Sequence, residues 1–312
     1  MTSPENTGLL RPPALRAGDR VAVTAASGAP RTEDLEKGVA ALESLGLIVD
    51  VLPSARAAGV PLDYLAGDDA TRAADLATAL TDPRYRAVFM ARGGYGAQRT
   101  LEGIDFASLG TPAPRVLVGY SDVTALIEAV SVHLGWVSLF GPMPVSDDFT
   151  PGSYAFDSLA RTLFTPAEAT RLTFPAARTL VGGTAEGVTL GGTASLLCSS
   201  LATSTSRPAS GGILFLEDVD EEPYRLDRIL TQLRRSGYLD GVAGILCGTF
   251  TGCGDPAEID ALLIDRLGDL GAPVLAGADI GHGVPMQTFP VGVPARLDAD
   301  GGTLTFDGPV LA

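Results

Sequence analysis

Short apolar runs alternate with amphipathic stretches through the first half of this chain of 312 residues. The apolar runs predict strands, and the stretches between them, with apolar residues at helical spacing, predict helices. Strands are predicted at residues 20–25, 47–52, 87–91, 116–119 and 137–140, the last closing the sheet, and helices at 33–45, 70–80 and 122–134. This order is typical of a mostly parallel sheet covered by helices, so we expect a doubly wound α/β domain.

Three polar or glycine-rich segments follow predicted strands of this domain. They are Ala26-Ser27-Gly28, Arg92-Gly93-Gly94-Tyr95-Gly96 and Tyr120-Ser121-Asp122. In doubly wound folds, ligands bind beyond the carboxyl ends of the strands. We therefore expect these segments to meet at one edge of the sheet and to form the functional site.

The second half of the chain predicts a further, smaller domain. Residues 142–192 are polar and rich in Pro, Gly and Thr, which indicates a connection between domains. Beyond them we predict strands at 212–216, 244–248 and 273–276, helices at 223–236 and 259–270, and a hairpin formed by 292–297 and 302–306. The predicted organisation is an amino-terminal domain over residues 1–150, a connector over 151–185, and a carboxy-terminal mixed α/β domain over 186–312.

Charge and hydropathy argue against two classes of partner. The formal net charge is −15 and the pI is near 4.5, whereas binding to nucleic acid depends on clustered Lys and Arg. No stretch of sequence reaches the roughly 18 uncharged apolar residues that a membrane span needs, and no apolar run follows a basic segment at the start, so we expect a cytoplasmic protein. The three cysteines, Cys198, Cys247 and Cys253, form no CxxC pair and indicate neither a disulfide framework nor a zinc site.

Ser121 is the candidate nucleophile. It falls where the predicted strand at residues 116–119 gives way to a helix, and such a turn exposes a hydroxyl among backbone N–H groups, as acyl transfer requires. The segment lacks the second glycine of the G-x-S-x-G nucleophile turn. Ser and Asp are also common at helix N-caps, so the alternative is that Ser121 or Asp122 caps the first helical turn.

A serine nucleophile needs a base that titrates near neutral pH, and the chain contains only two histidines. His133 lies near the end of an apolar predicted helix, where an imidazole commonly caps free carbonyls. His282 stands between Gly281 and Gly283 in a predicted loop, and such glycines allow close approach of substrate or of another domain. His282 is therefore the candidate base, and an exposed loop histidine without a catalytic role is the alternative.

A carboxylate that could orient the imidazole follows the predicted strand at residues 212–216. Glu217 comes directly after this apolar run and would emerge at the carboxyl end of the strand. The acids at residues 220–222 precede a helix, whose dipole favours negative charge there without any chemistry. Spacing alone leaves Asp218 open as the alternative to Glu217.

The glycine cluster at residues 92–96 fits neither the dinucleotide fingerprint nor the Walker loop, which needs a Lys-Ser/Thr pair. We predict instead that a backbone N–H of Gly93 or Gly94, together with that of Asp122, forms an oxyanion hole. A plain tight turn is the alternative. Arg92 is a candidate for binding a substrate carboxylate, because a guanidinium can donate two parallel hydrogen bonds to it.

Short blocks spread over most of the chain carry a further signal. They begin at Arg16 (RAGDRVAV), Ala91 (ARGGYGA), Gly119 (GYSDVTAL), Phe140 (FGPM), Leu216 (LEDVDE), Tyr224 (YRLDR) and Gly281 (GHG). Together they resemble the LD-carboxypeptidase family, which also contains the microcin C immunity peptidases. By this resemblance, Ser121 is the nucleophile, Glu217 the acid and His282 the base of a Ser-Glu-His triad that needs no metal or cofactor.

The resemblance also implies where the site lies and what it acts on. The amino-terminal domain would supply the serine and the carboxy-terminal domain the acid and base, with the site between them. Family members commonly form homodimers and, in cell-wall recycling, cleave murein tetrapeptides between an L-centre, lysine or diaminopimelate, and the terminal D-alanine. Two departures predict different substrate contacts: Thr193 follows Gly191-Gly192 where the family often has Asn, and Phe140 stands where it often has His.

Two other functions stay open. One is a microcin C-type peptidase that hydrolyses an acyl-sulfamoyl or aminoacyl-nucleotide linkage, although the block at Arg92 resembles the murein branch more closely. The other is a catalytically silent α/β protein that binds a small peptide or nucleotide, against which the complete set of triad residues argues. We therefore expect a serine-type hydrolase whose substrate is a murein tetrapeptide, free or linked to a glycan or nucleotide.

Overall fold

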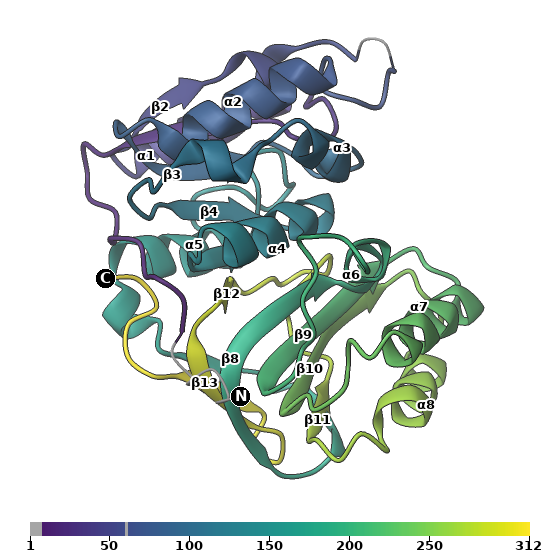
Figure 1. Cartoon of the computed structure of the whole chain (residues 1–312). Helices are drawn as coiled ribbons and strands as arrows, with labels where there is room; N and C mark the ends of the chain where they lie inside the picture. Colours follow the sequence, from purple (N-terminus) through teal and green to yellow (C-terminus); the bar gives the residue numbers. More distant parts are fainter. Residues whose placement is uncertain (1–7, 60–61) are drawn as a thin grey trace.

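The computed structural model describes residues 8–59 and 62–312 of the chain (Figure 1). Within these residues, the strands form one sheet of six and one of eight. In Figure 1, the first sheet and its helices lie above the second, and helices α7 (Pro223–Arg235) and α8 (Pro256–Leu267) pack together at one side of the second. The predicted α/β class, with one mostly parallel and one mixed sheet, is confirmed. None of the described helices is both long and apolar enough to cross a membrane.

The first sheet is built from the alternation of the first half. Its parallel strands, in sequence order, are β1 (Arg20–Thr24), β2 (Ile48–Val51), β3 (Tyr85–Met90), β4 (Val116–Gly119) and β5 (Ser138–Phe140). They are connected by α1 (Thr32–Ser44), α2 (Asp69–Thr81), α3 (Ala97–Glu102) and α4 (Thr124–His133). Every predicted strand and helix of this half is found close to its predicted bounds, because apolar runs buried between helices give a strong pattern.

The prediction that residues 137–140 close this sheet is wrong. Strand β12 (Phe289–Val291) pairs antiparallel with β5 and extends the sheet by one strand. Three residues are too few for a strand to be recognised by alternation. The pairing ties a segment near the carboxyl end of the chain to the sheet that carries Ser121.

The second sheet is mixed. Its central strands β8 (Thr184–Thr193), β9 (Gly212–Val219), β10 (Gly244–Thr251) and β11 (Val274–Ala276) are parallel. The predicted hairpin is present as β13 (Pro294–Asp298) and β14 (Thr303–Phe306), with β13 antiparallel to β8. The short helix α6 (Ala194–Ser199) follows β8 directly. The carboxyl ends of β8 and β9 thus lie together, below the turn that follows β4.

The segment predicted as a connector, residues 151–185, contains regular structure. Helix α5 (Tyr154–Phe164) starts where Ser153 Oγ accepts a hydrogen bond from the Phe156 N–H, and it buries an apolar face. Strands β6 (Arg171–Thr173) and β7 (Arg178–Val181) form the two edges of the second sheet. Such short, partly exposed edge strands give little hydrophobic pattern. The domain limits at residues 150 and 185 remain a prediction.

Three phenylalanines join the two sheets beside the predicted site. Phe140 in β5, Phe215 in β9 and Phe289 in β12 are fully buried. The ring centroids of Phe140 and Phe215 lie 5.0 Å apart, and those of Phe215 and Phe289 lie 4.8 Å apart. Aromatic pairs of this kind contribute about 1 kcal/mol beyond their buried area. Phe140, a departure from the family pattern, therefore packs the two sheets together.

Candidate active site

Ser121 occupies the turn between β4 and α4, as the sequence predicts. Its backbone has φ = +63°, a left-handed conformation that is unfavourable for a residue with a side chain. Such strain costs about 1–3 kcal/mol and is found at functional turns that expose a nucleophile. Among the described residues, neither the Ser121 nor the Asp122 side chain accepts a hydrogen bond from the backbone of α4, so capping of α4 does not account for them.

The Asp122 carboxylate connects this turn to two neighbouring segments by hydrogen bonds. It accepts hydrogen bonds from Ser27 Oγ at 2.6 Å and from the Ala97 N–H at 2.8 Å, and burial raises its pKa. The Gly28 N–H in turn donates to the Gly93 carbonyl at 3.1 Å. The three segments that follow strands therefore do meet at one edge of the first sheet.

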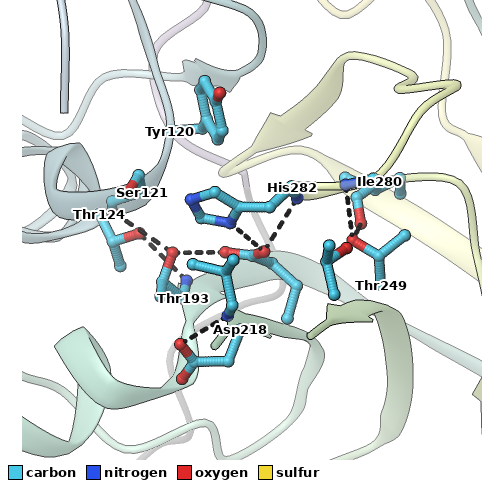
Figure 2. Close-up of polar contacts among 12 residues, drawn as sticks. Tyr120, Ser121, Thr124, Thr193, Asp218, Thr249, Ile280 and His282 are labelled. Atoms are coloured by element: carbon cyan, nitrogen blue, oxygen red, sulfur yellow. Dashed lines mark hydrogen bonds and ion pairs between the residues drawn. The ribbon is translucent and has the colours of Figure 1, made fainter. Parts of the chain in front are cut away.

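Glu217 and His282 are in direct contact (Figure 2). His282 Nδ1 lies 2.7 Å from Glu217 Oε2, and the His282 backbone N–H donates to the same oxygen at 3.2 Å. The Glu217 side chain is fully buried, whereas 15% of the His282 side chain is exposed. The acid is thus held inside the protein, while the imidazole reaches the surface of the site.

The glycine before His282 makes this contact possible. Gly281 has φ = +115°, and a Cβ atom placed there would lie 2.6 Å from Glu217 Oε2. A side chain at this position would therefore displace the carboxylate. The close approach predicted for the glycine flanks of His282 is an approach by Glu217 itself.

Asp218 faces away from the imidazole. It accepts hydrogen bonds from the Ser195 N–H at 2.8 Å, from Ser195 Oγ at 3.2 Å and from the Val219 N–H. Burial raises its pKa to about 6. Because successive side chains of a strand point to opposite faces, only one of the two acids can meet His282, and that acid is Glu217.

Opposing effects act on the pKa of His282. Burial of the imidazole lowers it, whereas the hydrogen bond and the charge of Glu217 raise it, as do the charges of Asp218 and Asp220. The net result is a pKa above the ordinary value of 6.5. An imidazole of this kind can take up a proton near neutral pH while a buried carboxylate balances its charge.

Ser121 and His282 line one open pocket of about 260 Å³. In Figure 2, the imidazole nitrogen that does not contact Glu217 points toward Ser121. No hydrogen bond between Ser121 Oγ and the imidazole is present in the described part of the chain. In unliganded sites such contacts are often long and tighten when substrate binds.

Backbone N–H groups are available beside the serine. Among the described residues, those of Gly93, Gly94 and Asp122 donate no hydrogen bond. A Cβ atom on Gly93 would lie 3.0 Å from Ser121 Cβ and 3.2 Å from its Oγ, so only glycine lets this loop lie against the serine. Gly93 and Gly94 also line the pocket. The loop can therefore offer donors to a charge that forms near Ser121.

Arg92 lines the mouth of the same pocket with an exposed side chain. Its Nη1 donates a hydrogen bond to the Ala29 carbonyl at 2.9 Å, which holds the guanidinium near the pocket. Its remaining N–H groups can bind an anionic group of a ligand. The exposed carboxylate of Asp147 lines the pocket as well, so the pocket contains one positively and one negatively charged side chain at its surface, those of Arg92 and Asp147.

Two contacts of the site were not predicted from the sequence. The Tyr120 ring lies against the His282 imidazole, with centroids 5.0 Å apart, and burial raises the pKa of its phenol. Thr193 Oγ1 donates a hydrogen bond to Glu217 Oε1 (Figure 2). The position of Tyr120 next to Ser121 was the available signal for the first contact. Thr193 was noted as a departure from the family pattern, but its contact with Glu217 became known only through the pairing of β8 with β9.

The second histidine is not part of this pocket. His133 ends α4 and stacks on Phe106, with centroids 4.5 Å apart. It lines a separate, larger pocket of about 530 Å³ that contains none of the other predicted site residues. All three cysteines have free thiols. Residues 8–59 and 62–312 contain no cluster of three or more His, Cys, Asp or Glu side chains suited to a metal ion.

Sequence comparison relates both halves of the chain to one family. The model of the LD-carboxypeptidase N-terminal domain matches residues 21–141, and that of the LD-carboxypeptidase C-terminal domain matches residues 186–297. A putative carboxypeptidase of Streptomyces coelicolor is 48% identical over 97% of this chain and 98% of its own length. A murein tetrapeptide carboxypeptidase of Pseudomonas aeruginosa is 32% identical over 90% of this chain and 94% of its own.

Solved structures of related proteins share the fold of this chain. The crystal structure of muramoyltetrapeptide carboxypeptidase from Oxalobacter formigenes matches with a TM-score of 0.81 and 30% identity, covering 93% of this chain and 99% of that one. MccF in complex with glutamyl sulfamoyl guanosine shares the fold, with a TM-score of 0.86 at 20% identity over 97% of this chain and all of that one. The resemblance found in the sequence blocks is confirmed: the chain belongs to the LD-carboxypeptidase family of peptidases.

Proposed function

We propose that this protein is a serine-type LD-carboxypeptidase that removes the terminal D-alanine of murein tetrapeptides in cell-wall recycling. The bond that it cleaves follows an L-centre, lysine or diaminopimelate. The observation that carries the proposal is the 2.7 Å contact between Glu217 and His282, in the pocket that also exposes Ser121 on a strained turn. The names of the Pseudomonas and Oxalobacter relatives support the substrate class.

The first half of the reaction forms an acyl-enzyme. His282 takes the proton of Ser121 Oγ, which attacks the carbonyl carbon preceding D-alanine, while Glu217 holds Nδ1–H and balances the imidazolium charge. The C–N bond then breaks, and His282 gives its proton to the departing D-alanine nitrogen. The remaining peptide stays bound to Ser121 as an ester.

The second half releases the tripeptide. A water molecule gives a proton to His282 and attacks the ester carbon, after which the proton returns to Ser121 Oγ as the tripeptide leaves. In both halves, the N–H groups of Gly93 or Gly94 and of Asp122 stabilise the negative oxygen. Losing one such donor typically costs about 3 kcal/mol of barrier height.

Arg92 is the group that we assign to the terminal carboxylate of D-alanine. It lies at the mouth of the pocket, and one of its N–H groups is already held by the Ala29 carbonyl. A guanidinium in this position can bind a carboxylate through two hydrogen bonds. The restriction to carboxypeptidase action then follows, since an internal peptide bond offers no such carboxylate.

A microcin C-type activity is the second candidate. The observation that favours it is the fold shared with MccF, whose solved complex contains glutamyl sulfamoyl guanosine. The same serine, base and N–H groups could attack an acyl-sulfamoyl linkage. A silent binding protein, the third possibility, would not react with a serine-directed probe such as a fluorophosphonate.

Three substrates separate these functions. We would incubate the protein with a murein tetrapeptide ending in D-alanine, with the same peptide ending in L-alanine, and with glutamyl sulfamoyl adenosine. Free alanine from the D-peptide alone is the expected result. Hydrolysis of the sulfamoyl compound alone would replace the proposal by the microcin C-type function, and reaction of the L-peptide at an equal rate would remove its LD specificity.

The cellular setting is proposed from the family resemblance. We propose a cytoplasmic homodimer, because members of the family commonly dimerise and recycle murein fragments inside the cell. Sedimentation velocity over a range of protein concentrations tests the dimer, which predicts about twice the 32.0 kDa mass of one chain. A mass of one chain throughout the range would contradict it.

A further inference from the structure

Thr193 lies beside Glu217 because of the register between two parallel strands. It is the last residue of β8, and in the ladder between β8 and β9 its direct partner is Glu217. Paired residues of neighbouring strands place their side chains on the same face of a sheet. Thr193 is 3% exposed and Glu217 is 0% exposed, so this pair meets inside the protein.

The Thr193 hydroxyl has one proton, and the distances show where it goes. Thr193 Oγ1 lies 2.5 Å from Glu217 Oε1 and 3.4 Å from the Ser121 carbonyl oxygen, so Glu217 is the main acceptor. The other carboxylate oxygen, Oε2, accepts from the backbone N–H and faces Nδ1 of His282. Each oxygen of Glu217 therefore has its own partner, and Thr193 is the one for Oε1.

Thr193 also contacts the segment that carries the nucleophile. Its backbone N–H donates to Thr124 Oγ1 at 3.1 Å, at the first residue of α4. A Cβ atom on Gly192 would lie 2.6 Å from Thr124 Oγ1, so the glycine is what lets β8 come this close. Thr193 thus touches both ends of the turn that runs from Ser121 to Thr124.

We propose that Thr193 is a positioning residue of this enzyme. Its hydroxyl holds the Glu217 carboxylate in the orientation that contacts His282, and its backbone N–H connects this pair to the turn that carries Ser121. The inference rests on the proposed function, because it takes Ser121, Glu217 and His282 as the catalytic groups. Thr193 is not among the residues that line the pocket shared by Ser121 and His282, and its side chain acts through Glu217.

Removing the Thr193 hydroxyl should lower the pKa of His282. Without Thr193 Oγ1, Glu217 Oε1 is a buried charged atom without a donor, so the carboxylate loses the hydrogen bond that fixes its orientation toward His282 and can turn away from the imidazole. The groups that act on the imidazole are Glu217, Asp218 and Asp220 by charge, and Tyr120 by ring contact. When Glu217 turns away, the strongest influence that raises the pKa of His282 is lost and burial, which lowers it, remains.

The first test is an NMR titration of the histidine ring protons in wild type, Thr193→Val and Thr193→Ser. The chain has only two histidines, so His133, which stacks on Phe106, serves as an internal reference. We expect the titration midpoint of His282 to fall in Thr193→Val and to stay at the wild-type value in Thr193→Ser, with His133 unchanged in both. A His282 midpoint that stays or rises in Thr193→Val overturns the inference.

The second test measures phosphonylation of Ser121 by a fluorophosphonate, in which the serine oxygen bonds to phosphorus, fluoride leaves and His282 takes the proton. We expect labelling about 10- to 100-fold slower in Thr193→Val and close to wild type in Thr193→Ser, since a hydrogen bond to a charged group has that magnitude. The matched control is Thr189→Val, which removes a buried hydroxyl from the same strand, where it donates to the Pro290 carbonyl. It should label at the wild-type rate.

The outcomes separate this inference from the proposed function. Equal slowing in Thr193→Ser or in Thr189→Val would mean that packing matters rather than the hydroxyl, and would overturn the inference. Neither test uses a peptide, so a wild type that labels but releases no D-alanine overturns the proposed substrate alone. If Thr193→Val does not fold, Thr193→Ala removes the same hydroxyl in a smaller side chain and is measured in its place.

Discussion

His282 Nδ1 lies 2.7 Å from Glu217 Oε2, although 65 residues separate the two in the chain. Glu217 is held at the end of β9, and His282 stands in the loop that follows β11. The remaining nitrogen of the imidazole is then free to face the serine that the first sheet supplies (Figure 2). This contact between two groups of the second half sets the orientation and charge of the base that faces Ser121 of the first half.

Replacing Glu217 by Gln keeps the size of the side chain and removes its charge. The imidazole then loses the acceptor that fixes its tautomer, and kcat/KM for D-alanine release should fall by about 10³-fold or more. Asp218→Asn is the matched control: that acid contacts Ser195 instead of His282, so the variant should lose far less activity. Similar losses in both variants would contradict the assignment of Glu217.

The pH dependence of the reaction should report the raised pKa of His282. Only the neutral imidazole can accept the serine proton, so kcat/KM should rise with pH through the pKa of the free enzyme. Because burial, which lowers that pKa, is outweighed by the hydrogen bond and charge of Glu217 together with the charges of Asp218 and Asp220, the midpoint should lie above 6.5. A series of initial rates between pH 5 and pH 9 measures it, and a midpoint below 6 would argue against the buried ion pair.

Gly281→Ala should displace the Glu217 carboxylate while leaving the three catalytic side chains themselves unchanged in sequence. The new Cβ would lie 2.6 Å from Glu217 Oε2, and a shift of about 1 Å in a catalytic group costs roughly 10²-fold in rate. Gly271→Ala is the control, since Gly271 also has a positive φ but its Cβ would meet no atom within 4 Å. We expect kcat to fall in the first variant and to be retained in the second. Equal activity in the two would contradict the contact.

Glu128 in α4 should make the protein less stable at higher pH. Burial raises its pKa to about 8, against 4.5 for the free side chain, and its Oε2 atom has no hydrogen-bond partner among the described residues. Between these pH values the folded protein keeps a proton that the unfolded chain releases, so the free energy of unfolding falls as pH rises.

Glu128→Gln cannot release a proton, so it should remove that part of the pH dependence. In urea unfolding at pH 4.5 and pH 8, the loss of stability between the two conditions should be smaller in the variant by about 4 kcal/mol. An unchanged loss would mean that Glu128 is ionised in the folded protein.

The first sheet could be predicted from the sequence because its strands are buried apolar runs between amphipathic helices. Residues 151–185 were harder to interpret: α5 is a single helix within a polar stretch, and β6 and β7 are short edge strands. Strand β12 was missed for the same reason, since three residues contain almost no alternation. Helices and strands with strong local periodicity could therefore be predicted from the sequence, whereas short or partly exposed elements could not.

The candidate site was predictable only in part. Ser121 stood out because it follows a predicted strand at the start of a helix, His282 because the chain has only two histidines, and Glu217 because it directly follows an apolar run. The choice between Glu217 and Asp218 depends on which face of β9 each side chain occupies, and the role of Thr193 depends on the register of β8 against β9. Neither is present in a single sequence, because pairing between distant strands leaves no local pattern.

The most direct test of the proposed LD-carboxypeptidase activity is release of free D-alanine from purified murein tetrapeptide by wild type, Ser121→Ala and His282→Ala. We expect one D-alanine per tetrapeptide from the wild type, and a rate lower by several orders of magnitude in both variants. Near-normal release by Ser121→Ala would show that another group performs the attack. No release by the wild type would contradict the proposed substrate.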